Sequence, residues 1–201
     1  DRNHFNYLVR KYGGDKYIKH FTCWNQLLTL IFGQLSSRKS LRDLVVALEV
    51  HQSKCYHLGF GRKPIARATL AKANQDRDYR IFEDFAFYMM DVARKEHIAN
   101  IFKLEGNVYV FDSTTIRFVC QFPDGEVPQA KGGVKIHFLY DLKTSVPAFF
   151  HITTAFVYDS QAMREVPYEP GAYYVFDRGY NAFKELYCIY LMNSFFGCTD
   201  Q

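Results

Sequence analysis

Apolar residues in the first hundred positions recur at the three- and four-residue spacing of amphipathic helices. The stretch from Trp24 to Gly33 is predicted to be a helix capped by Thr22, and Ser40 is predicted to cap a second helix over residues 41–50, because these hydroxyls can accept hydrogen bonds from free backbone N–H groups. Further helices are expected over residues 67–74 and 79–98. The first half of the chain is therefore predicted to be nearly all helical.

After Gly106 the pattern changes to the alternation that is typical of strands. Strands are expected over residues 107–119, 134–142, 148–157 and 172–176, and a helix is expected over residues 182–193. Turn residues favour hairpins between the first three strands. A right-handed crossover would then place the fourth strand beside the first. The predicted fold class is α+β or α/β, with an N-terminal helical domain followed by a mixed sheet and flanking helices.

Two of the predicted strands end on an aspartate, in Val-Tyr-Val-Phe-Asp112 and in Tyr-Tyr-Val-Phe-Asp177. A polar residue directly after a buried strand lies at the mouth of that strand and is held by a rigid element. Hard divalent cations prefer carboxylate oxygens as ligands. Asp112 and Asp177 are therefore candidate metal ligands, and the predicted crossover brings them side by side.

Charge is distributed unevenly along the chain. Residues 1–103 contain 18 Lys and Arg against 10 Asp and Glu, whereas the remaining residues contain 7 against 11. The basic excess is concentrated between Arg38 and Arg80, which is typical of a surface that binds a phosphate backbone, although a solvated helix surface gives the same pattern. The candidate DNA-contacting residues of this segment are Arg38, Lys39, Arg42, Arg62, Lys63, Arg67 and Lys72.

Composition narrows the class of protein. Hydrophobic residues make up 48% of the chain, no apolar run reaches the roughly 18 residues of a membrane span, and the N-terminus lacks the pattern of a signal peptide. The five cysteines are scattered and form no C-x-x-C pair, so neither zinc nor redox chemistry is indicated. The 19 Phe and 15 Tyr recur mostly at core spacing, which favours packing over base stacking. A reduced cytoplasmic protein is expected.

A strand ending in Phe-Asp112-Ser-Thr, a three-strand meander, and Phe-Asp177-Arg-Gly-Tyr before a helix together resemble the core of a bacterial insertion-sequence transposase of the DDE type. The basic half, including Ser40-Leu-Arg-Asp-Leu and the segment starting Ala68-Thr-Leu-Ala-Lys, resembles the N-terminal DNA-binding region of that group. The resemblance implies a helical DNA-binding domain over residues 1–103 and an RNase H-like catalytic core over residues 104–201.

The resemblance also implies chemistry and partners. Asp112 and Asp177 would be the first two metal-binding carboxylates, with Asp112 as the bridging one. Two Mg²⁺ or Mn²⁺ ions about 3.5–4 Å apart would activate the attacking oxygen and stabilise the leaving oxygen. The implied partner is double-stranded DNA, bound at the element ends and at the target by a homodimer, with no membrane and no small-molecule cofactor. Arg178 would contact phosphate or orient the neighbouring acid.

The third acid of this family is missing from the sequence. The family pattern of Tyr, two residues, Arg, three residues, Glu, six residues, Lys does not occur, and Glu185 is interpreted as a solvated helix position. The chain stops about where a fifth strand should begin, so an N-terminal fragment or a truncated gene is expected. With two carboxylates, the 201 residues are expected to bind metal weakly and not to cleave DNA alone.

Three further polar residues receive two interpretations each. Lys135 and His137 alternate on the second strand and should share one face of the sheet, where they would approach the DNA backbone or only decorate the strand. Asp159 follows the third strand and is either a fourth acid near the site or the cap of a helix that starts near Ser160, which is the favoured interpretation.

Two alternative functions are kept open. Without the third acid, the chain could be a truncated or domesticated transposase that binds specific DNA and does not cut it. A phosphohydrolase of the haloacid-dehalogenase type would also begin with a strand ending in Asp-x-Asp-x-Thr. Here Thr114 stands in place of the second aspartate and a meander follows in place of a helix, so this function is disfavoured.

Overall fold

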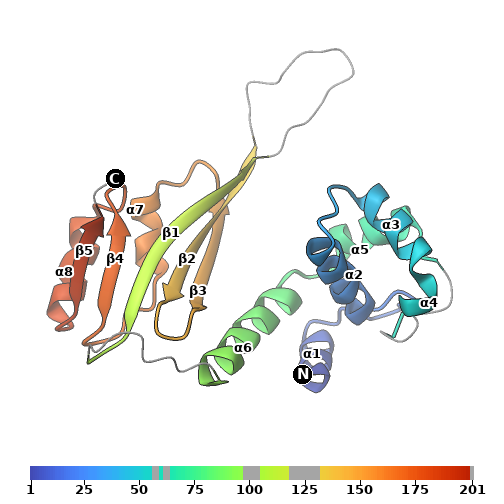
Figure 1. Ribbon diagram of the computed structural model, residues 1–201, viewed down its shortest axis with the longest axis horizontal. Coiled ribbons are helices and arrows are strands. Elements are labelled where there is room, and N and C mark those ends of the chain that lie inside the picture. Colours follow the sequence, from blue (N-terminus) through green and yellow to red (C-terminus); the bar gives the residue numbers. More distant parts are fainter. Residues whose placement is uncertain (56–58, 61–63, 97–104, 118–131, 200–201) are drawn as a thin grey trace, which may run out of the picture. The chain divides into compact units, whose positions relative to one another are not determined.

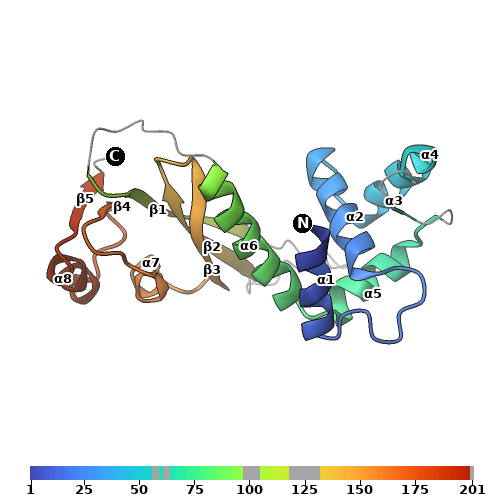
Figure 2. The same ribbon diagram turned by 90° about the horizontal axis from the view of Figure 1, so that it is seen from below.

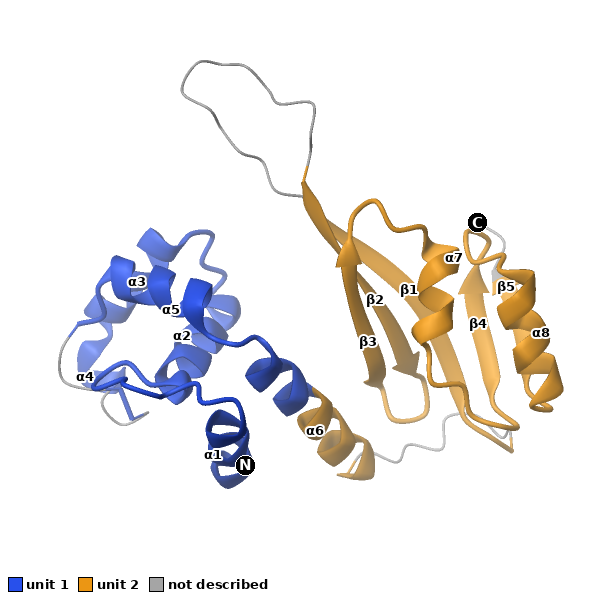
Figure 3. Cartoon of the chain, turned by 180° about the vertical axis from the view of Figure 1, so that it is seen from behind, with its two compact units in different colours: residues 1–86 blue, residues 87–201 orange. Residues whose placement is uncertain are grey.

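The computed structural model describes residues 1–55, 59–60, 64–96, 105–117 and 132–199. The chain divides into two compact units, Asp1–Ala86 and Phe87–Gln201, and each is described by itself (Figure 3). In the described part of the chain, no helix combines the length and apolar character that crossing a membrane requires. Cys23, Cys55, Cys188 and Cys198 are free thiols.

The first unit is built from helices, as the sequence predicts (Figure 1). Thr22 caps α2 by accepting a hydrogen bond from the backbone N–H of Asn25, and Ser40 caps α3 in the same way from Asp43. Both predicted caps are thus confirmed. The helices are α1 (Arg2–Lys11), α2 (Cys23–Leu35), α3 (Leu41–Val50), α4 (Gln52–Cys55), α5 (Arg67–Asp76) and α6 (Arg80–Glu96), which extends into the second unit.

Helix α1 is a helix that the sequence analysis did not predict. It is short, and Asp1 caps it by accepting from the backbone N–H groups of Asn3 and His4. Its apolar face packs in a cluster with Cys23 of α2 and Ile81 of α6. Tertiary packing therefore stabilises a helix whose own length is marginal.

The second unit contains one five-stranded sheet with the order β3-β2-β1-β4-β5. The first three strands form an antiparallel meander, whereas β4 and β5 run parallel to β1. This mixed order is consistent with the RNase H-like core that the resemblance implied, and the predicted crossover does place the fourth strand beside the first. The strands are β1 (Val108–Arg117), β2 (Gly133–Asp141), β3 (Val146–Thr154), β4 (Tyr173–Asp177) and β5 (Phe195–Thr199).

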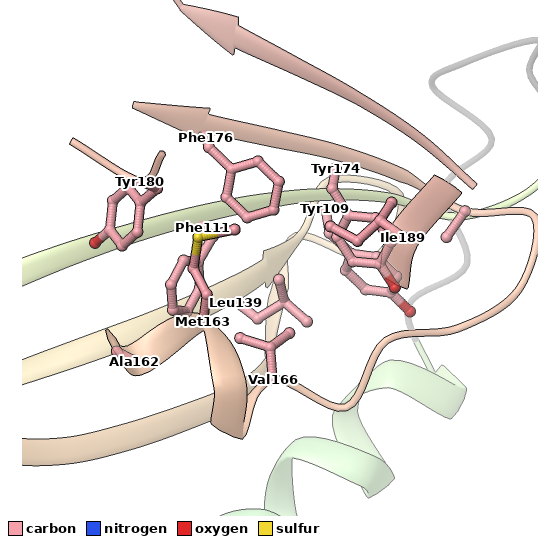
Figure 4. Packing of buried hydrophobic residues seen from close by; sticks show 11 residues of the cluster. Tyr109, Phe111, Leu139, Ala162, Met163, Val166, Tyr174, Phe176, Tyr180 and Ile189 are labelled. Carbon is pink, nitrogen blue, oxygen red and sulfur yellow. The ribbon is translucent and has the colours of Figure 1, made fainter. Parts of the chain in front are cut away.

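Three helical segments of this unit contribute to its core. They are α7 (Asp159–Ala162), the 3-10 turn η2 (Met163–Glu165) and α8 (Phe183–Leu191). Figures 2 and 3 show α7 and α8 on the same side of the sheet. Alternate residues of β1 and β4, among them Phe111 and Phe176, point toward these helices and are almost fully buried. Figure 4 shows both rings in one cluster with Met163 of η2 and Ile189 of α8. Strand alternation thus places these apolar side chains on the helix-covered face of the sheet.

Strand β5 corrects one expectation. The sequence analysis placed the start of a fifth strand at about the end of the chain, but residues Phe195–Thr199 already form that strand and pair with β4 in parallel. The run is short and the two phenylalanines are substantially exposed, so its pattern gave little signal as a buried strand. These residues form a strand because they pair with β4.

Candidate active site on two parallel strands

Strands β1 and β4 carry the two candidate acids to the same level of the sheet. The last residues that the strands pair in register are Phe111 and Phe176, and the next residue on each strand is Asp112 or Asp177. Asp177 ends β4 as predicted, but the prediction that Asp112 ends its strand is wrong, because β1 continues to Arg117 through its pairing with β2. Parallel neighbours in register advance together, so the aspartates follow side by side. Because Phe111 and Phe176 point into the helix-covered core, alternation turns both carboxylates toward the opposite face.

Each carboxylate is oriented by the backbone that follows it. Asp112 Oδ1 accepts a hydrogen bond from the backbone N–H of Ser113 at 2.7 Å, and Asp177 Oδ1 accepts one from Arg178 at 2.6 Å. Neither carboxylate forms an ion pair with a described residue. Asp112 is exposed, whereas Asp177 is half-buried. Two accessible carboxylates on rigid neighbouring strands suit a hard divalent cation. Over the described ranges, no three His, Cys, Asp or Glu side chains gather as a metal cluster.

The helix-covered face of β1 carries a polar cluster directly behind Asp112. Lys135 and His137 of β2 pair across from Thr115 and Ser113, and both approach the carboxylate of Asp159, which confirms that they share a face. The distances to Asp159 Oδ1 are 3.2 Å from Lys135 Nζ and 3.7 Å from His137 Nδ1. Burial lowers the pKa of His137, with the negative charge of Asp159 opposing that shift.

The favoured interpretation of Asp159 as a helix cap is wrong. Tyr158 occupies the cap position of α7 and makes no side-chain capping hydrogen bond, whereas Asp159 is the first residue inside the helix. Its carboxylate turns to the sheet, where Oδ1 accepts from Ser113 Oγ at 3.0 Å and from Lys135 Nζ at 3.2 Å. A partly buried serine and lysine offered better partners than the backbone N–H groups of a one-turn helix.

Tyr180 is a residue of the site to which the sequence analysis gave no role. Its backbone N–H donates to the carbonyl oxygen of Asp177 at 3.0 Å, and its ring packs edge-on against Phe111 with the centroids 4.9 Å apart (Figure 4). The hydroxyl is buried beside Ser113 and makes no hydrogen bond of good geometry with a described residue. Burial raises its pKa, and the charges of Asp159, Asp112 and Asp177 add to that shift.

The sequence signal for Tyr180 was its place in Phe-Asp-Arg-Gly-Tyr, where an aromatic residue follows a strand end at a short, fixed distance. The same motif contains Gly179, whose φ lies outside the left-handed region. A Cβ built on Gly179 would meet only Asp159 Oδ2, at 3.9 Å. The turn after Asp177 therefore passes beside Asp159 and has room for a Cβ at this position.

Glu185 is not the solvated helix position that the sequence suggested. Its side chain is 13% exposed, and Oε1 lies 3.7 Å from Nε of Arg164. Amphipathic spacing alone could not show this, because the partner comes from η2. No described contact links Glu185 to either aspartate.

The candidate DNA-contacting residues lie mainly in the first unit. Arg38 and Lys39 precede α3, Arg42 lies on α3, and Arg67 and Lys72 lie on α5; all five are exposed. Arg38 is paired with Asp43 at 3.4 Å. Arg62 and Lys63 fall outside the described residues. Arg178, in the second unit, is exposed.

The first unit also has a surface hollow of about 450 Å³ that Lys72 borders. Its polar wall includes Lys19, His20 and Arg77. Arg77 has a structural role, because its guanidinium donates hydrogen bonds to the carbonyl oxygens of Phe21 and Thr22 and to Gln26 Oε1. The hollow therefore adds basic side chains to the surface that carries Lys72.

Two family models match the chain. Residues 103–187 match the model described as "Transposase DDE domain", and residues 1–61 match a domain of unknown function (DUF4372). The curated protein named "Putative transposase y4zB", from Sinorhizobium fredii (strain NBRC 101917 / NGR234), is 44% identical over 48 residues. This segment is 24% of the chain and covers 14% of that relative. Asp112 and Asp177 both lie inside the segment matched by the first model.

Proposed function

We propose that this chain, whose residues 103–187 match the transposase DDE domain, is the part of an insertion-sequence transposase that binds element ends and supplies two carboxylates for metal-dependent DNA cleavage and strand transfer. The observation that carries the proposal is the register of β1 and β4. After the pair Phe111 and Phe176, the next residues are Asp112 and Asp177. A cation held by both would be bound by two rigid strands.

Each residue of the candidate site has a separate role in this proposal. Asp112 on the central strand and Asp177 on its neighbour would hold Mg²⁺ or Mn²⁺. The bound ions would supply activation of a water or 3′-hydroxyl and stabilisation of the leaving oxygen. The backbone N–H groups of Ser113 and Arg178 keep one oxygen of each carboxylate fixed, so that the other faces the substrate. Arg178 would contact a phosphate beside the second acid.

DNA recognition belongs to the basic helical half in this proposal, with residues 1–103 as the DNA-binding domain and 104–201 as the catalytic core. Exposed cations on α3 and α5 and between α2 and α3 support it, since phosphate contacts need accessible positive charge. The partner is double-stranded DNA, at the element ends and at the target. A homodimer on paired ends completes the proposal.

The test uses the protein encoded by the complete gene that contains this chain, with DNA carrying the flanking repeats of the element as substrate. Asp112→Asn and Asp177→Asn should each abolish end cleavage in Mg²⁺ or Mn²⁺. Both should bind the ends with unchanged affinity, because the basic helices are intact. Glu165→Gln, which removes an exposed carboxylate on η2, is the matched control and should cleave normally. Cleavage retained by either aspartate variant would contradict the proposal.

A further inference from the structure

Asp159 lies beside the residues that follow the two aspartates, Ser113 in the middle of β1 and Gly179 in the turn after β4. Its Oδ1 accepts the hydrogen bond from Ser113 Oγ at 3.0 Å, and Ser113 directly follows Asp112. Its Oδ2 faces the turn after β4, where a Cβ on Gly179 would lie 3.9 Å away. One carboxylate therefore accepts a hydrogen bond from the residue after the first acid and lies beside the turn after the second.

This position matters because the ladder between β1 and β4 ends just before the acids. The paired residues run from Val108 with Tyr173 to Phe111 with Phe176. Beyond that point β1 continues to pair with β2, while Asp177 pairs with Thr199 of β5. No ladder pairing in the described sheet thus joins Asp112 to Asp177, and Asp159 fills the interval from the helix-covered face.

The carboxylate of Asp159 is itself held firmly. Lys135 Nζ donates to Asp159 Oδ1 and also to the carbonyl oxygen of Val157 at 3.1 Å, which ties the lysine to the segment that leads into α7. Side-chain exposure is 14% for Lys135 and 31% for Asp159. A partly buried pair of this kind has few alternative geometries, and loss of either member leaves an unpaired charge.

We propose that Asp159 is a positioning residue for the metal pair, which through Ser113 and the turn at Gly179 keeps Asp112 and Asp177 at the separation that a shared divalent cation needs. The inference rests on the proposed function. It differs from a role as a third ligand, because Asp159 acts from the face of β1 opposite to Asp112. Residues that orient metal ligands in this way typically change metal affinity by 10–100-fold when replaced.

The experiment measures Mn²⁺ affinity of the 201-residue chain by electron paramagnetic resonance, for wild type and for Asp159→Ala, Asp159→Asn, Ser113→Ala and Asp112→Asn. Asp159→Ala and Ser113→Ala should each weaken binding about tenfold or more. The double variant Asp159→Ala/Ser113→Ala should bind Mn²⁺ only slightly more weakly than Asp159→Ala, because both residues act through one hydrogen bond. Asp159→Asn, which keeps an acceptor for Ser113, should lie between. Glu165→Gln should bind as wild type does.

A second, metal-free readout is amide hydrogen exchange. Asp159→Ala should accelerate exchange in peptides that cover Ser113 and Gly179, and leave the β2–β3 pairing around Leu139 protected. If Asp159→Ala had the same amide exchange and the same Mn²⁺ affinity as wild type, the inference would be overturned and the proposed metal site would stand. A second result would also overturn the inference. If Asp159→Ala lost Mn²⁺ binding as completely as Asp112→Asn while Ser113→Ala bound Mn²⁺ normally, Asp159 would be a direct ligand. Mn²⁺ binding that is identical in wild type and Asp112→Asn would instead overturn the proposed metal site and the inference with it.

Discussion

Phe111 of β1 and Phe176 of β4 pair in register and meet edge to face in the core, with ring centroids 6.1 Å apart. Each is 1% exposed, and each is followed by one of the two candidate acids. The aromatic pair therefore sets the level at which the two carboxylates lie on their strands. Because each aspartate directly follows one of these rings, burial of the two rings also places the two carboxylates.

Phe176→Ala is expected to reduce the free energy of unfolding by about 3–5 kcal/mol, because a large ring is removed from a closed core. Urea unfolding monitored by circular dichroism measures the change. Phe183→Ala removes the same ring from α8, where it is 83% exposed, and should change stability by no more than about 0.5 kcal/mol. Equal losses for the two variants would show that the core assignment is incorrect.

Gly106→Ala is expected to be destabilising by about 1–3 kcal/mol or more, for two reasons. Gly106 has a φ of +101°, and a Cβ there would press on the backbone carbonyl oxygen of Gly171 just before β4. The carbonyl cannot move without disturbing the start of the parallel pair. Gly197→Ala is the control, since a Cβ there has open space and its φ is not left-handed. Thermal unfolding that is equal for both variants would contradict this account.

Replacing Arg62, Lys63 and Arg67 together by glutamine should weaken DNA binding and flatten its salt dependence. If all three contact phosphates, the slope of log K against log salt falls by about 2.7, since each phosphate contact contributes about 0.9. Fluorescence anisotropy over a salt series measures both effects. Arg2, Arg10 and Lys16 are exposed cations of the same unit outside the basic segment, and replacing those three should leave the slope nearly unchanged. An unaltered slope in the first variant would move the DNA surface elsewhere.

Asp84 links stability to pH in the first unit. Its carboxylate accepts from Tyr12 Oη at 2.7 Å and pairs with Lys11 Nζ at 2.9 Å; the hydrogen bond from Tyr12, then Lys11 and the charge of Arg80, lower the pKa of Asp84. The unfolded chain therefore binds the proton more readily, so the stabilisation is complete above pH of about 4 and is lost as pH falls through the lower folded pKa.

Asp84→Asn should consequently reduce stability at pH 7 by about 0.2–1 kcal/mol, the range of partly exposed ion pairs, and by less at a pH of about 2.5. Urea unfolding at the two pH values gives the comparison. Asp91→Asn, on the same helix and paired with the exposed Lys95, is the control and should have the smaller effect at pH 7. A deficit of the same size at both pH values would exclude the charge of Asp84 as its cause.

Much of the fold was predictable because its signals are local. The hydroxyls of Thr22 and Ser40 mark helix starts wherever a free N–H follows, and apolar alternation marks β1 and β4 without knowledge of their neighbours. Helix α1 and strand β5 were missed or misplaced because each depends on a partner, Cys23 and Ile81 for the helix and β4 for the strand. Short elements carry little periodic signal of their own.

The residues of the candidate site divide along the same line. Asp112 and Asp177 could be named as candidates from the sequence by itself, because an apolar run followed by an acid is a local pattern and the chain order predicts which strands adjoin. Only the tertiary structure decided the roles of Asp159, Tyr180 and Glu185, whose partners come from elements distant in sequence. A side chain's choice between capping its own helix, facing solvent or meeting another element depends on which polar groups the fold leaves beside it. That arrangement exists only once the sheet and α7 have packed together.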